Sequence, residues 1–132
     1  MNNSLATIDP TFIALMHGSF RKDSALQPFA REILLVECHV SGTLGDELRG
    51  VEAGLLPGTM LTLQREPANA HDKLAIRVYD TVGHALGYVP RITNAPLARL
   101  MDAGKQLLAR IETKEWRGDW LRIDISVYMR EF

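Results

Sequence analysis

A polar loop between two predicted strands carries most of the side chains in this sequence that could bind a ligand or do chemistry. Apolar and polar residues alternate in Leu61–Gln64, and from Ala75 a second segment places Ile76 and Val78 on one face and Arg77 and Tyr79 on the other. Such alternation predicts half-buried strands. Pro67 ends the first strand because proline has no N–H to give to a strand partner. Asn69 and Asp72 favour tight turns. Loops held between strands often carry binding groups. The candidate residues of this loop are Arg65, Glu66, Asn69, His71, Asp72 and Lys73.

The residue types of the loop and of the strand that follows fit recognition of a nucleic-acid end. The Asp72 carboxylate can accept a proton from a sugar hydroxyl, while Lys73 and Arg91 can meet a neighbouring phosphate. His71 and Tyr88 offer flat faces on which an unpaired base can stack. The other reading is structural: the turn-forming residues then only shape the loop, and Tyr88 only packs in the core.

A second candidate region is the predicted hairpin at residues 116–120, which carries two tryptophans. Lys114, Arg117 and Arg122 make this region locally basic, which favours an anionic partner. Trp116 then serves either as a binding platform or as a lid on the end of the fold.

Catalytic and metal-binding motifs are absent from the sequence. None of the G-x-S-x-G, P-loop, H-E-x-x-H and C-x-x-C patterns occurs. Cys38 lies on the apolar face of a predicted strand, and His71, Asp72 and His84 fall short of a zinc-ligand pattern. We therefore expect no catalytic residue, no metal and no cofactor. A hydrolase that uses His71 and Asp72 is the least favoured hypothesis.

The hydrophobic pattern predicts a mainly β fold. A helix is expected to begin at Thr93 or Asn94, with Pro96 just inside it, and to end at Gly104. Because each strand has one apolar face, a closed or nearly closed sheet would hide both faces and edges. The sequence thus predicts a small OB-like six-stranded β-barrel with one helix between the fourth and fifth strands. The predicted strands are 33–40, 60–64, 75–79, 85–89, 107–112 and 121–127.

Length and composition limit the domain organisation and the partners. The 132 residues allow one core, and we expect an N-terminal extension at 1–31 and a barrel domain at 32–132. Fifteen basic and sixteen acidic residues exclude a strongly basic surface, so any nucleic-acid site must be local. The single cysteine rules out an internal disulfide and favours a reducing compartment. The absence of a signal-peptide pattern and of an apolar run of about 20 residues predicts a cytoplasmic protein away from the membrane.

Two motifs resemble the HIRAN domain, a module found in single-domain bacterial proteins and at the N-terminus of some eukaryotic remodelling ATPases. They are Arg-Glu-Pro-x-Asn-x-x-Asp-x-x-Ala-Ile at residues 65–76 and Gly-Tyr-Val-Pro-Arg at 87–91. The similarity runs from about Leu34 to the C-terminus. The resemblance implies an OB-like barrel that captures the free 3′ end of single-stranded DNA at stalled forks.

By motif position, the resemblance also implies roles for individual residues. Asp72 corresponds to the residue that reads the terminal hydroxyl, His71 to the aromatic that stacks on a base, and Arg91 to the lysine that contacts phosphate. Tyr88 takes the place of the histidine in the second motif, and Asn69 is the motif asparagine.

One departure from the family pattern bears on DNA binding. The members that bind DNA ends carry an arginine and an aromatic residue after the glycine that ends the first strand. Here Gly42 is followed by Thr43, Leu44 and Gly45, so two expected contacts are missing and weaker binding is implied.

Two functions therefore follow from the sequence. The first is a nucleic-acid-binding module that recognises single-stranded DNA, with a 3′-OH end as the finer hypothesis, through the loop from Arg65 to Asp72 with Tyr88, Arg91 and Trp116. The alternative is a protein-interaction or scaffold domain that uses residues 1–31 to form a homo-oligomer or to bind a partner protein.

Overall fold

The computed structural model describes residues 31–43 and 45–131. Apart from Arg31, the predicted N-terminal extension lies outside the described residues. Its proposed role as an oligomer or partner contact therefore stays a prediction. In the part of the chain that is described, no helix is both long enough and apolar enough to cross a membrane.

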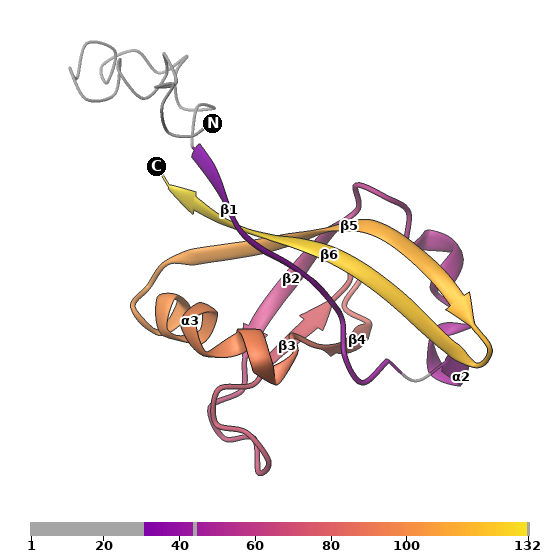
Figure 1. Ribbon diagram of the computed structural model, residues 1–132, viewed down its shortest axis with the longest axis horizontal. Coiled ribbons are helices and arrows are strands. Elements are labelled where there is room, and N and C mark those ends of the chain that lie inside the picture. The colour runs from indigo at the N-terminus through magenta and orange to yellow at the C-terminus, as the bar shows by residue number, and fades with distance from the viewer. Residues whose placement is uncertain (1–30, 44, 132) are drawn as a thin grey trace. The chain divides into compact units, whose positions relative to one another are not determined.

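The described chain is mainly β, with one sheet of six strands and one long helix between β4 and β5, which confirms the predicted fold class (Figure 1). The sheet order is β1-β6-β5-β2-β3-β4. The strands are β1 (Arg31–His39), β2 (Met60–Arg65), β3 (Ile76–Tyr79), β4 (Ala85–Tyr88), β5 (Gln106–Arg117) and β6 (Trp120–Glu131). The helical segments are α2 (Gly45–Leu48), the 3-10 turn η2 (Glu52–Gly54) and α3 (Arg91–Asp102).

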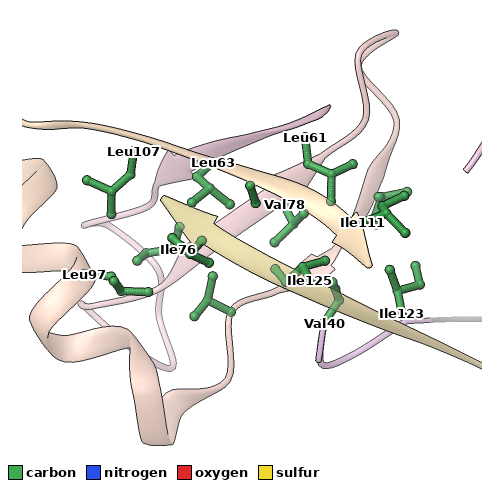
Figure 2. Packing of buried hydrophobic residues seen from close by; sticks show 14 of the residues in the cluster. Val40, Leu61, Leu63, Ile76, Val78, Leu97, Leu107, Ile111, Ile123 and Ile125 are labelled. Carbon is green, nitrogen blue, oxygen red and sulfur yellow. The ribbon is translucent and has the colours of Figure 1, made fainter. Parts of the chain in front are cut away.

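Alternation in the strands produces the core, because alternate side chains of a strand point to opposite faces of the sheet. In β6 the apolar members Leu121, Ile123, Ile125 and Val127 are all fully buried. Leu97 and Ala98 of α3 join the same cluster. Figure 2 shows how side chains of β2, β3, β5, β6 and α3 meet in this cluster with Val40, which follows β1; it labels Val40, Leu61, Leu63, Ile76, Val78, Leu97, Leu107, Ile111, Ile123 and Ile125.

Most element boundaries differ from the sequence prediction, and the fifth and sixth strands differ most, since β5 extends to Arg117 and β6 to Glu131 and not to residues 112 and 127. Two further boundaries have a local reason. α3 begins at Arg91, directly after Pro90, and not at Thr93 or Asn94. The reason is local: the Thr93 N–H and Oγ1 both donate to the Pro90 carbonyl, at 3.0 and 3.1 Å, which completes the first turn without a capping side chain. The β5–β6 hairpin is also tighter than the predicted 116–120 connection, since Gly118 adopts φ +64° in a two-residue turn.

The two edge strands of the sheet meet just beyond the end of β1. The Ser41 N–H donates to the Tyr88 carbonyl, and the Tyr88 N–H donates to the Ser41 carbonyl, both at 2.8 Å. This pair joins the β1 side of the curled sheet to β4. Edge groups that would otherwise be left unpaired thus find partners, and the sheet becomes an OB-like half-barrel.

Gly87 permits this close approach. A Cβ atom at this position would lie 2.4 Å from the Ser41 carbonyl oxygen and 2.7 Å from Val40 Cγ1. The first of these contacts is to backbone, which cannot move aside without breaking the Ser41–Tyr88 pair.

We predict that Gly87→Ala lowers the free energy of unfolding by about 1–3 kcal/mol, because the added methyl group overpacks the closure. Urea denaturation followed by tryptophan fluorescence measures the change. Gly54→Ala is the matched control, since a Cβ atom there meets nothing within 4 Å, and its effect should stay within about 0.5 kcal/mol. Equal unfolding midpoints for the two variants would contradict the assignment of Gly87 as the closure residue.

Candidate functional site

The loop between β2 and β3 is held by its own side chains. Asn69 Oδ1 accepts the backbone N–H groups of His71 at 2.8 Å and Asp72 at 3.0 Å, and Asn69 Nδ2 donates to Glu66 at 3.1 Å. Asp72 Oδ1 accepts the Leu74 N–H at 2.9 Å. The two turn-forming residues therefore do shape the loop, as the structural reading of the sequence expected.

The second oxygen of Asp72 is directed away from the loop backbone. Oδ2 accepts a hydrogen bond from Asn94 Nδ2 of α3 at 2.8 Å and lies 3.6 Å from Arg91 Nε. The hydrogen bond from the Leu74 N–H, and to a smaller extent the hydrogen bond from the Asn94 amide, hold the pKa of the Asp72 carboxyl below its usual range. The side chain is 20% exposed and lines a pocket, so a ligand in that pocket can reach the ionised carboxylate.

The Tyr88 hydroxyl is already part of a network. It accepts a hydrogen bond from Arg77 Nη1 at 2.8 Å and donates to Glu66 Oε1 at 2.9 Å. The Arg77 guanidinium also lies over the Tyr88 ring, 4.8 Å from its centroid. Partial burial and the hydrogen bond to Glu66 raise the pKa of Tyr88. The phenol is therefore neutral at physiological pH, and a base could stack only on the ring face opposite Arg77.

These groups line one pocket of about 300 Å³. It lies where the loop, the closure of the sheet and the start of α3 come together. Its lining consists of Ser41, Asn69, His71, Asp72, Ala75, Tyr88, Val89 and Arg91. The structure thus brings together five of the eight binding residues predicted from the sequence: Asn69, His71, Asp72, Tyr88 and Arg91.

Three predicted residues do not line this pocket. Arg65 makes a bidentate ion pair with Asp102, with distances of 2.9 and 3.1 Å, and its guanidinium also donates to the Ala75 carbonyl at 2.8 Å. Lys73 is exposed on the same loop. Trp116 lies in β5 near its hairpin end, with the Arg49 guanidinium 4.6 Å from its ring centroid.

Trp116 belongs to a different region of the fold. Figure 1 shows the loop between β2 and β3 at the bottom and the β5–β6 hairpin tip at the far right. Trp116 therefore cannot add to the same small pocket.

The charges around the pocket are balanced. Arg77 lies 3.7 Å from Glu66, Arg91 lies 3.6 Å from Asp72, and Arg65 is paired with Asp102. At the hairpin end, Lys114 is paired with Glu52 and Arg117 with Glu115. The cations named in the sequence analysis thus do not combine into one positive groove. A ligand must be recognised here by hydrogen bonds and shape more than by a strong positive field.

A larger hollow of about 550 Å³ is lined by Pro90 and by residues of β1, α3, β5 and β6. Its polar lining includes the carboxylates of Glu37, Glu112 and Asp124 but only one guanidinium, that of Arg122. This excess of negative charge disfavours a nucleic-acid backbone, so the smaller pocket is the better candidate despite its size. Among the described residues, no three His, Cys, Asp or Glu side chains converge as metal ligands.

Asn94 is the site residue that the sequence analysis missed. It was expected only as a possible cap of α3, but it is 2% exposed and its amide is directed at Asp72. No local pattern signals this contact, because 22 residues separate the two positions. The one available clue was a buried-face position in a helix occupied by a polar side chain.

Comparisons with known proteins agree with this architecture. A protein of Lactobacillus plantarum, solved as a crystal structure, is 27% identical, with a TM-score of 0.70 over 77% of this chain and 98% of that chain. The HIRAN domain of human HLTF is 24% identical, with a TM-score of 0.58 over 76% of this chain and 79% of that chain, and shares the fold.

Sequence comparisons identify the family. The helicase-like transcription factor of Oryctolagus cuniculus is 33% identical over 114 residues, which cover 74% of this chain but only 11% of that relative. The model of the HIRAN domain matches residues 36–131. The chain therefore belongs to the HIRAN domain family.

Proposed function

We propose that this HIRAN domain is a non-enzymatic module that binds nucleic acid, and that its pocket receives the 3′-hydroxyl end of single-stranded DNA. The observation that carries the proposal is the Asp72 carboxylate, ionised and partly exposed beside Arg91. Membership of the HIRAN family supports the nucleic-acid part. The pocket chemistry supports the choice of the strand end.

A 3′-terminal nucleotide offers one hydroxyl donor and, on its 5′ side, one phosphate. Asp72 Oδ2 can accept the hydroxyl proton, and charge-assisted hydrogen bonds of this kind are stronger than neutral ones. The Arg91 side chain is 69% exposed, so it can turn from Asp72 toward the phosphate at small cost, because exposed ion pairs are weak. A 3′-phosphate would instead bring negative charge against the Asp72 carboxylate.

The pocket walls suit a single unpaired base. The His71 ring is exposed and the Tyr88 ring is half-buried with one face covered by Arg77. Stacking on such rings contributes about 1–3 kcal/mol per base and is tolerant of sequence.

Binding should be weaker than in family members with the arginine–aromatic pair after the first strand. Thr43 occupies the first of these two positions, is 6% exposed and donates its hydroxyl to the Leu121 carbonyl at 2.8 Å. It therefore stabilises the fold and cannot replace an arginine at a phosphate. Leu44 lies outside the described residues.

We predict that a fluorescein-labelled single strand ending in 3′-OH binds about tenfold more tightly than the same strand ending in 3′-phosphate or a blunt duplex, and that Asp72→Ala removes this preference. Loss of one charge-assisted hydrogen bond is worth about 1.5–3 kcal/mol. Fluorescence anisotropy measures the dissociation constants.

Two further variants show whether the charge of Asp72 itself, and not a disturbed loop or a change in net charge, causes the preference for the 3′-OH end. Asp72→Asn preserves an acceptor for the Leu74 N–H, so it tests the charge without loosening the loop. Asp119→Ala removes a fully exposed carboxylate at the hairpin tip and controls for net charge. Equal binding of hydroxyl and phosphate ends, unaffected by Asp72→Ala, would rule out the proposed hydroxyl reading.

We predict that Arg91→Ala weakens binding of all single strands alike and reduces the slope of log K against log salt by about 1, the signature of one lost phosphate contact. Arg99→Ala, a change of equal charge elsewhere on the exposed face of α3, should leave the slope unchanged. An unaltered slope for Arg91→Ala would remove Arg91 from the phosphate-binding role.

The balanced charge around the pocket favours a second candidate, a protein-interaction domain that assembles through residues 1–31. This function predicts that light scattering finds more than one chain per particle for the full chain and a single chain once residues 1–31 are removed. A monomer in both forms would count against it.

A further inference from the structure

The first turn of α3 contains a buried polar side chain that the helix itself does not need. Pro90 is the N-cap residue of α3 and no side chain makes a capping hydrogen bond there, so the Asn94 amide does not cap the helix. Buried polar groups in folded proteins nearly always have a partner, and for the Asn94 amide that partner is Asp72 Oδ2 at 2.8 Å.

This contact fixes the orientation of the Asp72 carboxylate. The Leu74 N–H holds one oxygen and the Asn94 amide holds the other. Rotation of the carboxylate would break both hydrogen bonds and leave the buried Asn94 donor unpaired, which is costly. An ionised carboxylate has about four acceptor positions, so the remaining ones stay directed toward the pocket side, where Arg91 approaches.

Building on the proposed function, we infer that Asn94 is a positioning residue that presents Asp72 Oδ2 to the terminal hydroxyl of a bound strand. It does so from a helix, a more rigid support than the loop that carries Asp72 itself. End selectivity then depends on a pair of side chains, one in the family motif and one outside it. This role assigns a binding function to a residue that neither sequence motif includes.

The first test needs no DNA. Asn94→Leu retains a side chain of similar shape without the donor, and Asn94→Ala leaves room for water should the leucine variant fail to fold. Since the Leu74 N–H and then Asn94 lower the pKa of Asp72, both variants should raise that pKa toward its ordinary value. A carboxyl ¹³C NMR titration of the folded protein measures it. An unchanged Asp72 pKa would overturn the inference.

Thr93→Ala is the matched control. It removes a hydrogen bond of the same helical turn, from Thr93 Oγ1 to the Pro90 carbonyl, but leaves the partners of Asp72 in place. The Asp72 pKa should therefore remain at the wild-type value in this variant. A rise as large as in Asn94→Leu would mean that any disturbance of the turn acts on Asp72, and would overturn a specific role for Asn94.

The second test measures end selectivity as the ratio of the dissociation constants for 3′-phosphate and 3′-OH strands. We expect this ratio to fall about fivefold in Asn94→Leu and to stay unchanged in Thr93→Ala, in keeping with the loss of one hydrogen bond to a charged group from a partly exposed site. If the Asp72 pKa has risen in a variant but this ratio is unchanged, the proposed effect of Asn94 on end selectivity would be overturned. If the wild-type protein itself shows no selectivity, the proposed function fails, and the link from Asn94 to end reading fails with it. The titration then still decides whether Asn94 holds Asp72.

Discussion

The pair of backbone hydrogen bonds between Ser41 and Tyr88 is the contact on which the rest of the arrangement depends. It joins the two edges of the sheet at 2.8 Å across Gly87. The same contact places Ser41 and Tyr88 in the wall of the pocket. Because the chain continues directly into Pro90 and α3, the closure also directs the first turn of that helix at the loop between β2 and β3. The pocket is therefore a consequence of how the sheet closes.

The charged side chains of the pocket are paired with one another in the free protein, and a ligand could take the place of some of these partners. Arg91 donates to the His71 carbonyl and lies near Asp72, and Arg77 is engaged by Tyr88 and Glu66. Such internal pairs keep the free site neutral and limit long-range attraction of a polyanion. A bound strand end would replace the weakest of them, the exposed contacts of Arg91, and leave the buried ones intact. Selectivity for the chemistry of the end, more than high affinity, is the expected result.

The local sequence pattern predicted the features that depend only on neighbouring residues, such as the buried face of a strand or the end of a helix. Alternation in β2 and β6 gave the buried faces, and Gly104 was correctly expected to follow α3, since it adopts φ +93° just beyond the helix end. The sequence could not reveal that Arg65 is held by Asp102, 37 residues away, or that Asn94 reaches Asp72. Pairings of this kind depend on which elements the closed sheet brings together, and no period of two or 3.6 residues encodes them.

The claim that the strand end enters the pocket at the closure is tested most directly by ¹H–¹⁵N NMR of the full chain titrated with a short single-stranded oligonucleotide ending in 3′-OH. We expect the largest amide shifts at His71, Asp72, Tyr88 and Arg91, with little change at Trp116. Shifts confined to the hairpin around Trp116, with the pocket amides unmoved, would contradict it.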